Sequence, residues 1–371
     1  MDVIGLINEG LVSTFDLEGQ DTLSISDNVV NVGNLKMPRP KFDEKHDKNK
    51  DFVLVQVVAF SCNYRDKAIV VKSSNKMSGA FSNTAAPVSF FGSDFVGIII
   101  EKGTNVSEFE LNDRVIPNCA YPTPPADGVA PGVVTNEASK GYLKLHKSKL
   151  LKVPDNMPNS IAAGYSIGGQ TSESMVRRSN VSQSDKVLVL SARSNTSLFI
   201  INALLHRGIK PTLLSTTKWS EDNLDLVKHC EVINLNRNVN KWPDDLEKFD
   251  VIFDPFFDIH LEEAIKHLNI GGRYITCGYK NQHESFEITN DIANQQNLQS
   301  IMLTAMVNNI SIIGNCIGET FDLENSLKNF NYKLPPFQID STLSTMEFKE
   351  FLDETYNKRN RFGKVIMNYV S

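Results

Sequence analysis

The chain has 371 residues, of which 41% are hydrophobic, so it is long enough to bury the cores of two domains of ordinary size. Its 38 basic and 44 acidic residues give a formal net charge of -6 without long blocks of like charge, which argues against a nucleic-acid-binding surface. The first residues lack the basic region of a secretory signal, and the apolar runs are short, so we expect neither a signal peptide nor a membrane span.

The cysteines occur singly along the chain. An odd number without a CxxC pair fits reduced thiols and provides no motif for a structural zinc ion. The sequence therefore predicts a cytoplasmic protein in which most of these thiols are buried and inert. They are Cys62, Cys119, Cys230, Cys277 and Cys316.

The first part of the chain, to about residue 155, has the pattern of short strands and turns. Residues 52–60 and 95–100 are predicted strands. Residues 119–136 contain four prolines together with glycines, which indicates a long loop. Loops of this length in compact domains are usually functional or mobile.

From residue 181 onward, strand patterns alternate with helical patterns. This alternation predicts a parallel sheet covered by helices on both faces. One of the helices, at 261–268, is expected to stop at Gly271-Gly272, and the tail is expected to form a helix at 346–356 and a strand at 364–369 that returns to the first domain. The predicted strands of the sheet are 187–190, 212–215, 232–235, 251–253, 273–277 and 310–313.

The segment 185–208 has the layout of a dinucleotide-binding strand, turn and helix, with Gly208 as the helix stop. Its turn, 191–197, contains no glycine, although glycines usually allow the backbone to approach a pyrophosphate there. We expect polar side chains to bind the cofactor instead. They are Ser194, Asn195 and Thr196, with Arg193 reaching either the pyrophosphate or the adenine face.

The second predicted strand of the sheet ends without an acidic residue. In dinucleotide-binding folds a carboxylate at this place accepts hydrogen bonds from the ribose of NAD. Here the strand runs into Ser215 and Lys218, and the first carboxylate is Glu221. Hydroxyls and a cation favour a 2'-phosphate, so the sequence predicts NADPH, with Lys218 contacting its phosphate.

Six short motifs follow one another along nearly the whole chain. They are SCNYRD at 61–66, FGSDFVG at 91–97, LNDRV at 111–115, FDVIFD at 249–254, GGRYITCG at 271–278 and FGKV at 362–365. In this order they resemble the motifs of the medium-chain dehydrogenase/reductase superfamily. This resemblance implies an α/β fold, with a Rossmann-type doubly wound parallel sheet and a β-rich GroES-like catalytic domain. We expect residues 1–155 and 320–371 to form the catalytic domain and residues 156–319 to form the cofactor-binding domain.

The same motifs are similar to those of the zinc-independent quinone and enoyl reductases. Zinc alcohol dehydrogenases of the superfamily have a cysteine ligand where this chain has Asn63, and a histidine–glutamate pair where it has Ser93-Asp94. We therefore expect no bound metal. A shifted zinc ligand at Cys62 is disfavoured because no histidine lies at ligand spacing from it, His46 and His146 being expected at the surface.

The resemblance also implies site residues. Thr171 is expected near the nicotinamide, and Gly278, Asn315 and Lys364 are expected to contact the cofactor. Without zinc, reduction of an activated C=C bond is easier than reduction of an isolated ketone, because hydrogen-bond donors can stabilise an enolate. The expected donors and loop residues are Asn63, Tyr64, Arg65 and Asp66: Tyr64 or water supplies the proton, and Asp66 orients the loop or is structural.

The sequence leaves several substrates as alternatives. A weaker resemblance to lanthipeptide reductases makes dehydroalanine in a precursor peptide, converted to D-alanine, the leading expectation. A quinone or a small enone is the alternative, and a modified peptide or small molecule is the only partner expected besides a second copy of the chain. Family analogy suggests a homodimer through an edge strand near 311–313. A non-catalytic cofactor-binding regulatory protein and a zinc dehydrogenase with relocated ligands also stay open.

Overall fold

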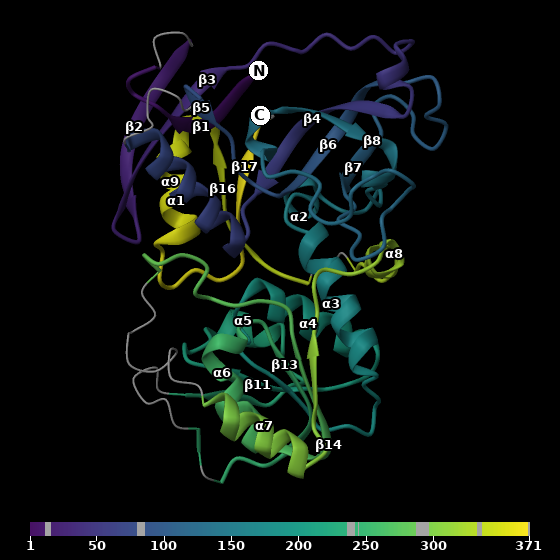
Figure 1. The fold of residues 1–371 in the computed structure, drawn as a ribbon, viewed down its shortest axis with the longest axis vertical. Coiled ribbons are helices and arrows are strands. Elements are labelled where there is room, and N and C mark those ends of the chain that lie inside the picture. The colour runs from purple at the N-terminus through teal and green to yellow at the C-terminus, as the bar shows by residue number, and fades with distance from the viewer. Residues whose placement is uncertain are drawn as a thin grey trace. The chain divides into compact units, whose positions relative to one another are not determined.

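The computed structural model describes residues 1–11, 16–79, 86–235, 242–243, 245–286, 297–331 and 336–369. The chain divides into two compact units (Figure 1), residues 1–167 with 338–371, and residues 168–337. The sequence predicted earlier boundaries, at 155 and 319. The difference has a packing reason, because helix α2 (Asn159–Ala162) contacts β-strands of the first unit and helix α8 (Thr320–Lys328) is joined to the second unit by an ion pair.

The first unit is built on two sheets. A four-stranded sheet has the order β2-β3-β1-β5, and a seven-stranded sheet has the order β16-β17-β4-β6-β7-β9 with β8 also paired to β4. The C-terminal strand β17 returns to this unit and pairs with β4, as the sequence predicted. The strands are β1 Asp2–Ile7, β2 Leu17–Ile25, β3 Asn28–Lys36, β4 Phe52–Ser61, β5 Val88–Ser89, β6 Asp94–Lys102, β7 Arg114–Pro117, β8 Tyr142–His146, β9 Leu150–Lys152, β16 Ile339–Ser344 and β17 Lys364–Asn368.

Two longer helices belong to the first unit, α1 (Tyr64–Ser78) and α9 (Phe348–Tyr356). The sequence predicted α9 but missed α1. A local signal for α1 exists, since Asn63 is a favourable N-cap residue and Asp66 stands three residues later, where its carboxylate accepts a hydrogen bond from the Asn63 amide at 2.8 Å. This polar helix start lies between two strands that the sequence predicted, β4 and β6, and its own pattern is weaker than theirs.

The second unit is a six-stranded parallel sheet of order β12-β11-β10-β13-β14-β15, which confirms the predicted fold class. Chain order reverses between β10 and β13, and ligands of such sheets bind beyond the carboxyl ends of the strands at this point.

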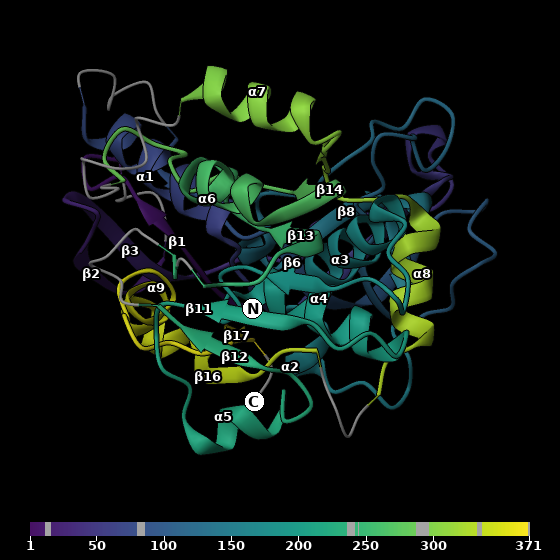
Figure 2. The same ribbon diagram turned by 90° about the horizontal axis from the view of Figure 1, so that it is seen from below.

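The helices of this unit include α6 and α7, which Figure 2 shows next to one another. The elements are β10 Val187–Val189, β11 Thr212–Ser215, β12 Val232–Asn234, β13 Phe249–Asp254, β14 Leu268–Thr276, β15 Ser311–Gly314, α3 Ser166–Ser179, α4 Asn195–His206, α5 Glu221–Asp225, α6 Phe257–Ala264 and α7 Leu298–Val307.

One predicted helix boundary is wrong. The helix expected at 261–268 begins earlier, as α6, and ends at Ala264, before a short 3-10 turn at Ile265–His267. Gly271 and Gly272 then lie within β14 instead of stopping a helix. The apolar stretch serves two elements, because Leu261 and Ala264 belong to α6 whereas Leu268 starts β14 and packs into the core of the sheet.

The glycine-free turn after β10 keeps the backbone shape of a glycine turn. Ser191 adopts a positive φ of 46°, which a glycine would adopt at less cost. Ser194 caps α4 by accepting a hydrogen bond from the Ser197 amide at 3.2 Å, and the buried Ser197 hydroxyl donates to the Leu190 carbonyl at 2.7 Å. Serine hydroxyls therefore tie the helix to the strand where glycines would only allow close packing. Gly208, with φ 74°, ends the helix as predicted.

The described helices include none that is both long and apolar enough to cross a membrane. All five cysteines are free thiols.

Candidate active site

In the first unit, β4 ends and α1 begins at a cluster of buried polar side chains. Asn63 is its centre, and its side-chain amide donates to Ser93 Oγ at 3.1 Å and to Asp94 Oδ2 at 2.8 Å. Ser93 in turn donates to Asp66 Oδ2 at 2.6 Å, and Asp94 Oδ1 accepts from the Ile167 amide at 3.0 Å. The side chains of Ser93, Asp66 and Asp94 are all fully buried.

A lysine from the other end of the chain completes this cluster. Lys364 Nζ lies 2.7 Å from Asn63 Oδ1, 3.3 Å from Asp94 Oδ2 and 3.4 Å from Ser61 Oγ. Sequence reasoning assigned Lys364 to the cofactor and did not connect it with Asn63. No local signal could have made that connection, because the two residues are 301 positions apart in the chain.

Arg65 connects the cluster to the proline-rich loop. Its Nη1 donates to Asp66 Oδ1 at 3.0 Å and to Asn136 Oδ1 at 2.8 Å. Burial raises the pKa of Asp66, and the neighbouring Arg65 charge and the hydrogen bonds from Asn63 and Ser93 oppose this rise. Residues 119–136 form the long loop that the sequence predicted, and Arg65 holds its last residue.

The hydrogen bonds limit what each predicted catalytic residue can do. An asparagine amide has two N–H groups, and those of Asn63 are directed at Ser93 and Asp94. Asn63 is therefore better placed to hold the cluster than to donate to a substrate. Tyr64 and Arg65 are half-buried at the start of α1. Their hydroxyl and guanidinium groups are hydrogen-bond donors.

Over the described parts of the chain, the structure has no group of three or more His, Cys, Asp or Glu side chains that could hold a metal ion. Cys62, the disfavoured zinc ligand, is buried, and this burial, followed by the nearby Asp66 charge, raises the pKa of its thiol well above the ordinary value. Burial likewise raises the pKa of Cys119 to about 12.

In the second unit, the predicted cofactor residues gather at the carboxyl ends of β10 and β11. Arg193 donates from Nη1 to the backbone carbonyl of Lys218, so the turn after β10 is joined to the turn after β11. Ser215 Oγ donates to the Thr217 carbonyl at 2.8 Å and shapes the second turn. The turns that carry the two predicted phosphate-binding cations are therefore held together.

A nicotinamide dinucleotide fits this arrangement. Asn195, at the start of α4, has a buried side-chain oxygen without a hydrogen-bond partner in the described structure, and a hydroxyl or amide of a ligand would satisfy it. Ser194, Thr196 and Asn195 share the first turn of α4, whose N-terminus favours an anion. One amide of this turn, that of Ser197, is already occupied by Ser194 Oγ.

The remaining predicted cofactor residues have structural partners. Thr171 is buried in α3, and a side chain at Gly278 would press against the Pro255 carbonyl. Asn315 Oδ1 accepts from Ser174 Oγ at 2.9 Å and from Arg178 Nη1 at 3.0 Å, while its amide donates to the Ile317 carbonyl at 2.8 Å. These bonds hold the segment that follows β15.

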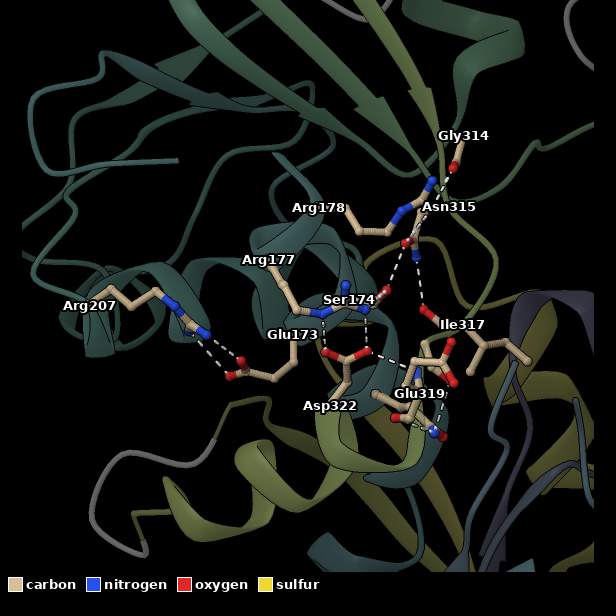
Figure 3. A network of polar contacts seen from close by, with 12 residues as sticks. Glu173, Ser174, Arg177, Arg178, Arg207, Gly314, Asn315, Ile317, Glu319 and Asp322 are labelled. Carbon is tan, nitrogen blue, oxygen red and sulfur yellow. Dashed lines mark hydrogen bonds and ion pairs between the residues drawn. The ribbon is translucent and has the colours of Figure 1, made fainter. Parts of the chain in front are cut away.

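Figure 3 shows the polar network to which Asn315 belongs. Arg177 of α3 makes a two-pronged ion pair with the buried Asp322 of α8, with both N–O distances at 2.8 Å. Arg207, after α4, pairs in the same way with Glu173 of α3. The ion pairs join α3 to α8 and to the residue that follows α4, and sequence reasoning did not find them.

A second buried network lies at the end of β13. Asp254 is fully buried and accepts from Tyr274 Oη at 2.5 Å and from the Phe256 amide at 2.8 Å, and its other neighbour is His260 Nδ1 at 2.9 Å. The sequence showed the FDVIFD strand that ends in Asp254. It carried no sign of the partners, because they come from β14 and α6.

Known proteins resemble this chain at the level of fold and domain. Residues 49–155 match the alcohol dehydrogenase GroES-like domain. The acryloyl-coenzyme A reductase of Sulfurisphaera tokodaii is 24% identical over 354 residues, which span 90% of this chain and 95% of that enzyme.

Two solved structures show the same fold at low sequence identity. A thermostable alcohol dehydrogenase from Pyrobaculum aerophilum is 20% identical, with a TM-score of 0.71 over 95% of this chain and 99% of that one. The 2-octenoyl-CoA carboxylase reductase CinF of a Streptomyces species, solved with NADP and 2-octenoyl-CoA, is 17% identical, with a TM-score of 0.70 over 99% of this chain and 87% of that one. The comparisons show that the chain has the fold of the alcohol dehydrogenases and a GroES-like domain at residues 49–155, and that it is similar to oxidoreductases of the medium-chain dehydrogenase/reductase superfamily.

Proposed function

We propose that the protein is a zinc-independent, NADPH-dependent reductase of a C=C bond conjugated to a carbonyl group. The observation that carries this proposal is the closed cluster around Asn63, in which an amide, a hydroxyl and the Lys364 ammonium bond to one another. Amides and ammonium groups are not ligands that Zn²⁺ selects. The names of two relatives, acryloyl-coenzyme A reductase and 2-octenoyl-CoA carboxylase reductase, support the choice of an alkene over an alcohol.

NADPH, when bound, supplies the hydride for the β-carbon of such an alkene. Negative charge then develops on the carbonyl oxygen, and Tyr64 and Arg65 donate hydrogen bonds to it. Asp66 keeps the Arg65 guanidinium in place through the ion pair at 3.0 Å. Tyr64 or a water molecule protonates the α-carbon. Asn63 contributes by holding the start of α1, which carries both donors.

The cofactor preference follows from the ends of β10 and β11. Arg193 and Lys218 are connected there, and Ser215 stands where NAD-dependent relatives of this fold have an acidic residue. Two cations and a hydroxyl favour the 2'-phosphate of NADPH. Asn195 and Thr196 serve the pyrophosphate and the ribose from the first turn of α4.

The substrate class is an alkene conjugated to a thioester or an amide. The thioester is favoured by the names of these two relatives, and neither name points to a lanthipeptide precursor. A dehydroalanine-containing peptide is chemically equivalent at the reacting atoms and stays in the proposal as a second substrate of the class. Quinones and small enones are the alternatives that the test must separate.

The test is the loss of NADPH absorbance with an enoyl thioester, a dehydroalanine peptide, a small enone and a quinone. We expect turnover with one of the first two substrates, no loss of activity on chelation, and a large decrease in kcat in Tyr64→Phe. Turnover of the quinone alone would contradict the substrate class. Stoichiometric zinc, removed by chelation together with the activity, would favour a zinc dehydrogenase, and NADPH binding without turnover would favour a regulatory protein.

We also propose that the protein forms a homodimer through β15 and α7. Strand β15 is an edge strand of the six-stranded sheet, and residues 311–313 lie within it. Exposed apolar side chains also lie on α7 and near the start of β14, and such a patch marks an interface. They are Ile270, Leu298, Met302, Leu303, Met306, Val307 and Ile312.

Light scattering of Met306→Lys and Leu303→Lys tests the dimer. Each charge placed in a buried apolar interface should raise the dimer Kd by roughly tenfold or more, and the double variant should be monomeric at micromolar concentration. Met346→Lys, at an exposed methionine of the first unit, is the matched control and should leave the mass unchanged. An unchanged mass in the double variant would place the interface elsewhere or rule out a dimer.

A further inference from the structure

Lys364 is the first residue of β17 and is almost completely buried, with 2% of its surface exposed. The residue before it, Gly363, has φ 106°, and a Cβ atom there would clash with the Gln338 carbonyl. The Lys364 amide donates to that carbonyl at 2.8 Å. The glycine therefore lets the chain turn tightly enough to direct the lysine into the interior of the first unit.

The ammonium group of this lysine is surrounded by hydrogen-bond acceptors. An ammonium group has three N–H bonds, and the three oxygens near Lys364 Nζ belong to Asn63, Asp94 and Ser61. Asn63 accepts from Lys364 and donates to Ser93 and Asp94, and Ser93 donates to Asp66. The chain of bonds therefore runs from the Lys364 ammonium to Asp66.

This chain of bonds reaches Arg65, one of the two proposed donors of the active site. Asp66 accepts a hydrogen bond from the backbone N–H of Asn63 at 2.8 Å and forms an ion pair with Arg65 at 3.0 Å. The orientation of the Asn63 side chain decides whether its nitrogen or its oxygen lies next to Ser93 Oγ. Ser93 Oγ in turn donates a hydrogen bond to Asp66. Since an amide rotated by half a turn would offer Lys364 a donor instead of an acceptor, the ammonium permits only one orientation.

We propose that Lys364 is a positioning residue for the reaction and not a ligand of the cofactor. Its buried charge is balanced by Asp94 and it fixes the side-chain amide of Asn63. Through Ser93 and Asp66 it holds Arg65 and the start of α1, where Tyr64 lies, in their reactive geometry. A cofactor phosphate would have to displace Asp94 and Asn63 from an ammonium that has almost no exposed surface. The inference rests on the proposed reductase function, and it replaces the role that the sequence assigned to Lys364.

The decisive comparison uses Lys364→Met, Lys364→Arg and the double variant Lys364→Met/Asp94→Asn. Loss of the ammonium should lower kcat by roughly 10- to 100-fold, because small displacements of positioned groups have effects of this size. The Kd of NADPH should stay within about twofold of the wild-type value. Lys364→Arg keeps the charge and should recover part of kcat, and the double variant should melt at a higher temperature than Lys364→Met, since it no longer buries an unbalanced carboxylate.

Lys349→Met is the matched control, because Lys349 forms an exposed ion pair with Asp21 in the same unit. It should change neither kcat nor the melting temperature appreciably. A Kd for NADPH raised tenfold or more in Lys364→Met, with kcat unchanged at saturation, would overturn the proposal and make Lys364 a cofactor ligand.

Failure of the proposed function has a different signature. If the wild-type protein reduces none of the test substrates, the reductase proposal fails by itself. The melting temperatures then still test whether Lys364 and Asp94 interact. Additive changes in melting temperature for Lys364→Met and Asp94→Asn would overturn the pairing, and a double variant that is more stable than either single variant would support it.

Discussion

Arg193→Ala is expected to weaken NADPH binding by roughly 10- to 100-fold, because a charge-assisted hydrogen bond contributes about 1.5–3 kcal/mol. The same change should weaken NADH binding less than about threefold, since NADH lacks the 2'-phosphate. Arg193 also donates to the Lys218 carbonyl, so its loss separates the turns after β10 and β11. Isothermal titration with both cofactors measures the two constants directly.

Lys218→Ala tests the same site without breaking that contact, because Arg193 binds the backbone of Lys218 and not its side chain. We expect a selective loss of NADPH affinity that is smaller than for Arg193→Ala, since the Lys218 side chain is exposed. Lys228→Ala, an exposed lysine of the same unit, is the control. Equal losses for NADPH and NADH would refute the phosphate assignment.

Asp254→Ala is expected to lower the free energy of unfolding of the second unit by about 2–5 kcal/mol, because each buried donor left without an acceptor costs about 1–3 kcal/mol. The alanine would leave the Tyr274 hydroxyl and the Phe256 amide without their acceptor, and Tyr274 is fully buried. Since a typical domain is stable by only about 5–15 kcal/mol, this is a large part of the total. Chemical denaturation followed by a probe in the second unit measures the loss.

Tyr274→Phe provides the graded comparison. It removes one donor and leaves Asp254 with its other partners, so the loss should be only about 1–2 kcal/mol. Burial, with the Asp254 charge as the next cause, raises the pKa of Tyr274 well above its ordinary value, so the hydroxyl stays a donor at neutral pH. A loss below about 1 kcal/mol in Asp254→Ala would mean that the site relaxes or admits water.

The strands of the second unit were the most predictable part of the fold. β11 has the predicted bounds Thr212–Ser215, and β10, β12, β13 and β15 differ from prediction by a few residues. Apolar runs of this kind are local signals, because a strand buried on both faces must be apolar throughout. The error at 261–268 arose where one apolar stretch serves first a helix and then a strand, and periodicity alone cannot divide it.

Some features of the glycine-free turn could also be predicted from the sequence. Its position between a strand and a helix was correct, and Ser194 and Ser197 have the polar roles that their side chains allow. The positive φ of Ser191 was not readable, because serine rarely adopts it. Asn112, in the LNDRV motif, likewise has a positive φ of 70°. Both residues keep a backbone shape that glycine would favour.

The sequence by itself determined the alternation of elements, the turns, the residues that surround the two sites and the absence of an acid after β11, because each of these depends on neighbours along the chain. Only the tertiary structure decided the partners of those residues: Lys364 with Asn63, Arg193 with Lys218, and Asp254 with Tyr274. Hydrogen bonds between distant segments depend on which strand ends meet, and strand order is set by packing of the whole sheet. The role of Asn63 changed for this reason, since its amide hydrogens are directed at Ser93 and Asp94.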